Sequence, residues 1–158
     1  MAIALNSSIP DFQATATSGQ QISPANLAGH QVVLYFYPKN STPGCTQEGQ
    51  DFRDLYDDFT AANTLILGVS RDSLRSHENF KTKQGFPFEL ISDEDETLCR
   101  LFDVIHAKKL YGKEHMGIVR STFLIDAKGV LRQEWRGVKV PGHVQEVLAA
   151  AQQLQQAD

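Results

Sequence analysis

Cys45 lies where an apolar stretch of the chain gives way to an amphipathic one, a position that favours a reactive thiolate. Residues 32–37 are apolar and rich in strand-forming types, whereas apolar residues recur with helical spacing from 52 to 59. Pro43 and Gly44 break the chain between the two stretches. Cys45 should therefore fall in the first turn of a helix, where free N–H groups and the helix dipole stabilise an anion. We predict that Cys45 is a nucleophile.

Three residues around Cys45 indicate which substrate the thiolate attacks. Thr42, three positions earlier, can point its hydroxyl at the sulfur or at an oxygen bound there. Pro38 stiffens the approach and offers no N–H donor. Glu48, three positions later, can bond to the backbone or to a cation. A thiolate beside a hydroxyl and free N–H groups suits attack on an oxygen that leaves as hydroxide or alkoxide, so the pattern predicts peroxide reduction.

Strands and helices alternate along the rest of the chain, which predicts an α/β protein. The expected elements in order are a strand at 32–37, a helix at 45–61, a strand at 64–70, a helix at 73–83, a strand at 88–92, a helix at 96–102, a hairpin of strands 121–125 and 131–135, and a last helix over 144–154. We expect residues 9–28 to form an N-terminal extension with short strands, and residues 103–119 a mobile loop. The order predicts a thioredoxin-like fold, with a mixed central sheet flanked by helices.

Composition limits the class of protein. The chain has 158 residues, 41% of them hydrophobic, so we expect a single domain over residues 1–158. A net charge of −4 with no basic stripe argues against nucleic acid and anionic membranes as partners. No signal segment and no run of 18 apolar residues is present, so we expect a cytoplasmic protein. The five histidines lack ligand spacing, and we expect no metal and no cofactor.

Two stretches resemble a known family. The segment from Tyr35 to Glu48, with its Pro-x-x-x-Thr-x-x-Cys spacing, and the segment from 120 to 126 are similar to the bacterioferritin comigratory protein branch of the peroxiredoxins, also called peroxiredoxin Q. The resemblance covers nearly the whole chain. It implies that Cys45 is the peroxidatic nucleophile and that the Thr42 hydroxyl bonds the peroxide. It also implies that Pro38 shields the thiolate and that Arg120 stabilises it and orients the substrate.

The chain departs from that branch in its resolving cysteine. Many members have this cysteine five residues after the nucleophile, where this chain has Gln50, and others have it one helix later, near Lys81, where this chain has none. The other thiol is Cys99, which we interpret as part of a helix core. We therefore expect a one-cysteine peroxidase of hydrogen peroxide and organic hydroperoxides, with a Cys45 sulfenic acid reduced by thioredoxin, glutaredoxin or glutathione. Resolution through a Cys45–Cys99 disulfide is the alternative mechanism.

Two other functions compete with peroxide reduction. A Cys–His hydrolase or transferase would use His115 or His143 as the base for Cys45. A non-catalytic thioredoxin-like binding or holdase module would use no nucleophile at all. We expect the protein to be a monomer or a weak homodimer.

Overall fold

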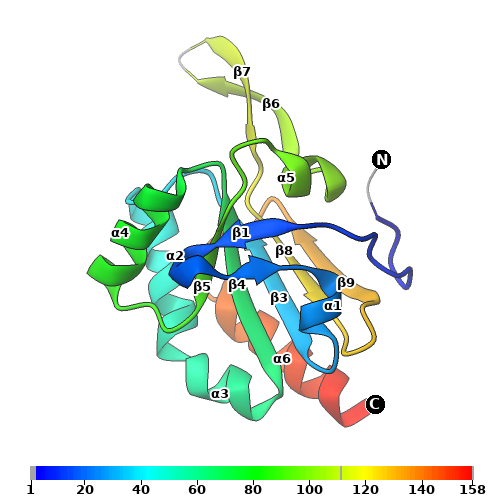
Figure 1. Ribbon diagram of the computed structural model, residues 1–158. Helices are drawn as coiled ribbons and strands as arrows, with labels where there is room; N and C mark the ends of the chain where they lie inside the picture. The colour runs from blue at the N-terminus through cyan, green and yellow to red at the C-terminus, as the bar shows by residue number, and fades with distance from the viewer. Residues whose placement is uncertain (1–2, 111, 158) are drawn as a thin grey trace.

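Seven strands form a mixed sheet with helices on both faces (Figure 1). The computed structural model describes residues 3–110 and 112–157. In chain order the elements are β1 (Ala14–Ala16), the 3-10 helix η1 (Thr17–Gly19), β2 (Gln21–Ile22), α1 (Pro24–Leu27), β3 (Gln31–Phe36), α2 (Pro43–Asp54), α3 (Tyr56–Ala61), β4 (Thr64–Ser70), α4 (Leu74–Gln84), β5 (Glu89–Ser92), α5 (Thr97–Leu101), β6 (Ile105–Leu110), β7 (Lys113–Ile118), β8 (Ser121–Ile125), β9 (Leu131–Arg136) and α6 (His143–Ala157).

The strand order in the large sheet is β2-β1-β5-β4-β3-β8-β9. β3, β4 and β5 are parallel neighbours, whereas β8 pairs antiparallel with both β3 and β9. Every residue of β3 is buried, because this strand has a partner on each side and helices on each face. The predicted mixed α/β sheet is confirmed.

Side chains of β3 alternate between two apolar cores. Val32, Leu34 and Phe36 join the core that includes Leu27 of α1 and Leu98 of α5. The intervening residues of the strand, together with Tyr37, join the core formed with α2, α3, α4 and α6. This alternation follows from the two-residue period of a strand, and it determines the face on which each cysteine lies.

The N-terminal extension does contain short strands, and it joins the main sheet. β1 pairs antiparallel with both β2 and β5. The predicted single helix at 45–61 is wrong in one respect, because Leu55 (φ −105°, ψ 11°) separates α2 from α3. The rings of Phe52 and Phe59 pack together across this break, with centroids 5.7 Å apart. The helical spacing of apolar residues in the sequence does not reveal a break in the helix at a single residue.

The predicted mobile loop at 103–119 is instead a β-hairpin. β6 and β7 pair antiparallel from Ile105 opposite Ile118 to Leu110 opposite Lys113. The hairpin projects past α5, away from the large sheet (Figure 1). The first three residues of β7 are all polar, so the segment shows little of the apolar alternation by which a strand is recognised in a sequence. Among the helices that the structure describes, none has the length and apolar character needed to cross a membrane.

Candidate active site

The helix α2 begins beside the end of β3 and places Cys45 in its first turn. Thr42 is the N-cap residue and Pro43 occupies the first helical position, where a missing N–H costs nothing. The Thr46 N–H donates to the Thr42 carbonyl at 2.9 Å, which closes the first turn. Cys45 is only 2% exposed. The sequence predicted this placement because it depends on adjacent residues.

Arg120 joins Cys45 to Glu48. Its Nη2 donates to Cys45 Sγ at 3.4 Å, and its Nη1 donates to Glu48 Oε1 at 2.6 Å. Arg120 immediately precedes β8, and the pairing of Ser121 with Phe36 carries it to the end of β3. A Cβ on Gly44 would lie 3.1 Å from Arg120 Nη2, so the glycine leaves room for the guanidinium.

Glu48 is fully buried, and this changes its protonation. Burial raises the pKa of Glu48 to about 7, although Arg120 acts in the opposite direction. Oε1 accepts from Arg120, while Oε2 has no hydrogen-bond partner among the described residues and is free to carry a proton. Burial also acts against the charge of Arg120, but Glu48 and Cys45 outweigh it and raise the pKa of Arg120. Arg120 therefore remains a cation beside the sulfur.

The Thr42 hydroxyl is oriented by the backbone of its own loop. Thr42 Oγ1 donates to the Lys39 carbonyl at 2.8 Å, so its proton does not point at the Cys45 sulfur. The lone pairs of this oxygen remain able to accept a hydrogen bond. Pro38 is partly buried in the same loop, two residues after the end of β3.

A closed ring of hydrogen bonds holds this loop against α4. The Tyr37 hydroxyl donates to Asn40 Oδ1 at 2.6 Å, and Asn40 Nδ2 lies 3.1 Å from His77 Nδ1. His77 Nε2 lies 3.3 Å from Ser70 Oγ, which donates to Asp72 Oδ2 at 2.5 Å. The Asn40 N–H donates to the same Asp72 oxygen at 3.0 Å and closes the ring. Because the Asn40 amide donates to Nδ1, a neutral His77 carries its proton on Nε2 and donates it to Ser70 Oγ. Burial lowers the pKa of His77.

Sequence reasoning did not identify the residues of this ring as part of the site. Asn40 lies in a loop and His77 in a polar helix, and their spacing of 37 residues matches no motif. Both are buried. A polar residue near a predicted strand end is a common loop feature, so nothing in the sequence distinguished them.

Cys99 lies on the other face of the sheet from Cys45. It is fully buried in the core that contains Leu98 and Phe102, whereas Cys45 belongs to the core formed with α2 and α6. The Cys99 N–H donates to Asp93 Oδ2 at 2.8 Å. Burial, and then the Asp93 carboxyl, raise the pKa of the Cys99 thiol strongly. Cys99 therefore stays a thiol in the core.

Neither candidate histidine base bonds to Cys45. His143 Nε2 lies 2.8 Å from Thr122 Oγ1, and burial lowers the pKa of His143 to about 4. His115 is exposed on β7, opposite Lys108. Within residues 3–110 and 112–157, the side chain that bonds the Cys45 sulfur is Arg120. This arrangement gives the Cys45 sulfur a neighbouring cation and no imidazole base.

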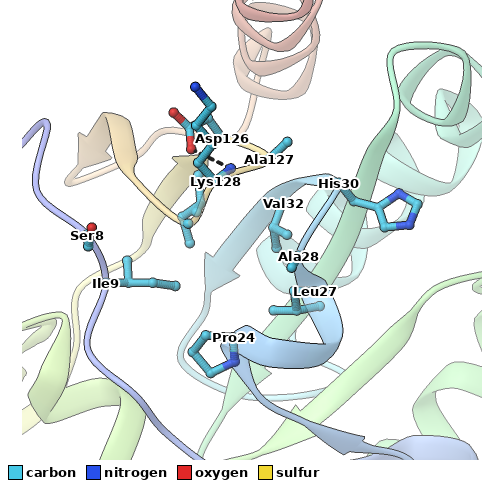
Figure 2. A pocket seen from close by; sticks show the side chains of 12 residues that line it. Ser8, Ile9, Pro24, Leu27, Ala28, His30, Val32, Asp126, Ala127 and Lys128 are labelled. Atoms are coloured by element: carbon cyan, nitrogen blue, oxygen red, sulfur yellow. Dashed lines mark hydrogen bonds between the residues drawn. The ribbon is translucent and has the colours of Figure 1, made fainter.

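A separate apolar pocket lies away from this site. Figure 2 shows it between the N-terminal segment, α1 and the turn after β8, with a volume of about 180 Å³. Its lining includes Val32 near the start of β3, whereas Cys45 follows the end of that strand. The lining contains no cysteine, so the pocket takes no part in the thiol chemistry.

The fold and the site together define a thioredoxin-like protein in which a cysteine at the start of a helix is paired with an arginine. Residues 5–134 match the AhpC/TSA family, and the chain belongs to that family. It is 56% identical over 140 residues to peroxiredoxin Bcp of Xanthomonas campestris, covering 89% of this chain and 88% of that one. It is 37% identical over 139 residues to peroxiredoxin Bcp of Escherichia coli, covering 88% and 89%.

Solved structures agree with these relatives. Peroxiredoxin Q of Xanthomonas campestris superposes with a TM-score of 0.87 at 53% identity, over 91% of each chain. A peroxiredoxin Q mutant from Xylella fastidiosa superposes with a TM-score of 0.87 at 41% identity, over 94% of this chain and 96% of the other. Within the AhpC/TSA family, the chain lies in the bacterioferritin comigratory protein and peroxiredoxin Q branch. It is therefore a peroxidase that uses a thiol to reduce a peroxide.

Proposed function

We propose that the protein reduces hydrogen peroxide and organic hydroperoxides at Cys45 by a one-cysteine mechanism. The Cys45 thiolate attacks one peroxide oxygen, the O–O bond breaks, and the other oxygen leaves as water or an alcohol after taking a proton. Cys45 is left as a sulfenic acid. The observation that carries this proposal is the Arg120 guanidinium, which donates to the sulfur and to Glu48 through different nitrogens.

Each neighbour of Cys45 has a role in this step. Arg120 stabilises the thiolate, and its fork can also donate to the oxygen on which negative charge develops. The Thr42 oxygen accepts a hydrogen bond from the peroxide O–H, since its own proton is committed to the Lys39 carbonyl. Pro38 limits the access of water to the thiolate, and Glu48 fixes the orientation of the guanidinium.

Recycling of the sulfenic acid requires an external thiol. Gln50 Nε2 donates to Gln84 Oε1 at 3.0 Å, and Lys81 pairs with Glu89 at 3.6 Å, so polar side chains occupy the two positions where relatives in this branch place a second cysteine. Solved mutants of the Xanthomonas protein replace cysteines at positions 48 and 84 of that chain, an interval of 36. Cys45 and Cys99 are instead 54 residues apart. Thioredoxin, glutaredoxin or glutathione would supply the reducing thiol.

The alternative Cys45–Cys99 disulfide has a geometric obstacle. A disulfide needs Cα atoms roughly 4.4–6.8 Å apart, whereas these two cysteines belong to apolar cores on opposite faces of the sheet. One of them would have to leave its core first. The relatives also argue against a holdase without chemistry, since the Xanthomonas protein is described by its alkyl peroxide reduction activity.

Mass spectrometry after one equivalent of hydrogen peroxide tests the mechanism. We expect addition of one oxygen at Cys45, no reaction in Cys45→Ser, and near-parental turnover in Cys99→Ser. Peroxide consumption is then compared with the thioredoxin and the glutathione–glutaredoxin systems. A loss of about two daltons, which marks an internal disulfide, would overturn the one-cysteine mechanism. Turnover by Cys45→Ser would overturn the assignment of the nucleophile.

A further inference from the structure

One face of the β6–β7 hairpin is basic. In the antiparallel register Lys108 lies opposite His115 and His106 opposite Gly117, so these residues share a face, which Lys113 extends. Lys113 and His115 are exposed, whereas Lys108 is half-buried. The opposite face carries the pair Lys109 and Glu114 instead, in which the charges offset each other. In a chain with a net charge of −4, the two lysines make this face locally positive.

Lys108 lies between this face and the active site. Its Cδ is 3.2 Å from the point that a Cβ on Gly117 would occupy, so the side chain runs across the strand that leads to Arg120. Burial and then Arg120 lower the pKa of Lys108, while Cys45 acts to raise it. Gly117 lies three residues before Arg120, so the strand that the Lys108 side chain crosses leads directly to the arginine of the active site. Among the described residues, no carboxylate forms a salt bridge with Lys108.

A half-buried cation without a counterion favours an anion beside it. Arg120 does not provide the same opportunity, because Glu48 already occupies one of its nitrogens. Hydrogen peroxide carries no anionic group for Lys108 to bind. The reducing thiol differs, because it attacks as a thiolate and brings additional negative charge to the site.

We propose that the Lys108 face of the β6–β7 hairpin binds the carboxylate of a small anionic thiol that reduces oxidised Cys45. The proposal rests on the one-cysteine mechanism above. The thiolate attacks the Cys45 sulfur, an S–S bond forms, the S–O bond breaks, and hydroxide leaves as water with the proton that the thiol released. A second thiol then attacks the mixed disulfide, which releases Cys45 and the oxidised small-molecule disulfide. Glutathione, with two carboxylates, is a thiol of this class.

The test measures the reduction of preformed sulfenic acid by thiols of different charge. One equivalent of hydrogen peroxide oxidises the full-length protein, and dimedone trapping with mass spectrometry confirms the sulfenic acid at Cys45. Glutathione, its diethyl ester and 2-mercaptoethanol are then added in separate experiments. The second-order rate constant is obtained from the loss of the dimedone-reactive form. The variant is Lys108→Met, and Lys109→Met is the matched control, since it removes the same charge from the opposite face.

We expect Lys108→Met to slow reduction by glutathione roughly 3- to 10-fold, with a smaller salt dependence, and to leave the rates of the two thiols that lack a carboxylate within about twofold. Lys109→Met should change none of the three rates. An equal loss for thiols with and without carboxylates, or an equal effect of Lys109→Met, would refute the binding of a carboxylate at Lys108. Absence of the Cys45 sulfenic acid in every variant would refute the proposed mechanism instead, so the two failures are distinguishable.

Discussion

Cys45 and Glu48 lie one helical turn apart on α2 and bond to different nitrogens of the same guanidinium, that of Arg120, at 3.4 Å and 2.6 Å. The Glu48 carboxyl group binds Nη1 of the guanidinium and leaves Nη2 directed at the Cys45 sulfur. A point charge would not be held in this way, since only a planar fork presents two nitrogens in fixed relative positions. The relationship therefore depends on the shape of arginine as well as on its charge.

Replacement of Arg120 by lysine tests this dependence on shape. The ammonium group would keep a positive charge at this position but could not donate to both Cys45 and Glu48, so we expect Arg120→Lys to recover little of the activity lost in Arg120→Ala. The loss should correspond to roughly 2–4 kcal/mol of transition-state stabilisation. The measurement is the second-order rate constant with hydrogen peroxide, with circular dichroism to check the fold. Near-parental activity in Arg120→Lys would show that charge alone suffices.

Thr42 should contribute through its hydroxyl oxygen. Thr42→Val preserves the shape of the side chain and removes both the bond to the Lys39 carbonyl and the acceptor for the peroxide proton. We expect a loss of roughly 2–4 kcal/mol in transition-state stabilisation, while Thr42→Ser, which retains the hydroxyl, stays close to the parent. The second-order rate constants of the two variants with hydrogen peroxide measure the contribution of the hydroxyl group. If valine and serine give the same rate, the hydroxyl has no part in the reaction.

Glu48 should make folding stability depend on pH. Its pKa is raised in the folded protein from 4.5 to about 7, so the folded state binds more protons than the unfolded state between these values. Glu48 therefore contributes about 3 kcal/mol to the free energy of unfolding below pH 4.5, and this contribution is lost as the pH rises through 7.

Glu48→Gln should remove this pH-dependent contribution to the free energy of unfolding. Urea denaturation at several pH values, compared with the parent, measures the difference. Asp54→Asn on the exposed side of the same helix is the control, because the Asp54 side chain is 65% exposed. Parallel stability curves for Glu48→Gln and the parent would contradict the raised pKa.

The hydrogen-bond ring around His77 should stabilise the loop before α2. His77→Phe leaves Ser70 Oγ without its imidazole donor and removes the acceptor of Asn40 Nδ2. We expect a loss of about 1–3 kcal/mol in the free energy of unfolding at neutral pH. Because burial holds the pKa of His77 below 6.5, its contribution should diminish as the pH falls below that value.

His115→Phe is the matched control for the ring, since it replaces an exposed histidine on β7. Chemical denaturation of both variants compares their stability, and we expect the control to change it by less than about 0.5 kcal/mol. Equal effects of the two substitutions would mean that the ring does not stabilise the fold.

The sequence by itself determined the local features of this protein. Pro43 and Gly44 after an apolar strand place Cys45 in the first turn of a helix, because the backbone preferences of adjacent residues decide where a helix starts. The alternation of strands and helices likewise indicated the mixed sheet. The likeness of two short segments to a known family suggested Arg120 as a partner of Cys45, although no local rule connects residues 75 positions apart.

Only the tertiary structure decided which distant groups meet. The pairing of β3 with β8 brings Arg120 to Cys45, and the side chain of His77 reaches Asn40 because α4 packs against Tyr37, the residue after β3. The hairpin that carries Lys108 escaped prediction because Lys108 and Lys109 are adjacent in β6 and β7 begins with three polar residues, so neither strand alternates clearly between apolar and polar residues. Hydrogen bonds and ion pairs act over a few ångströms. Which side chains interact therefore depends on their distance in the folded chain, and the spacing of residues along the sequence does not give that distance.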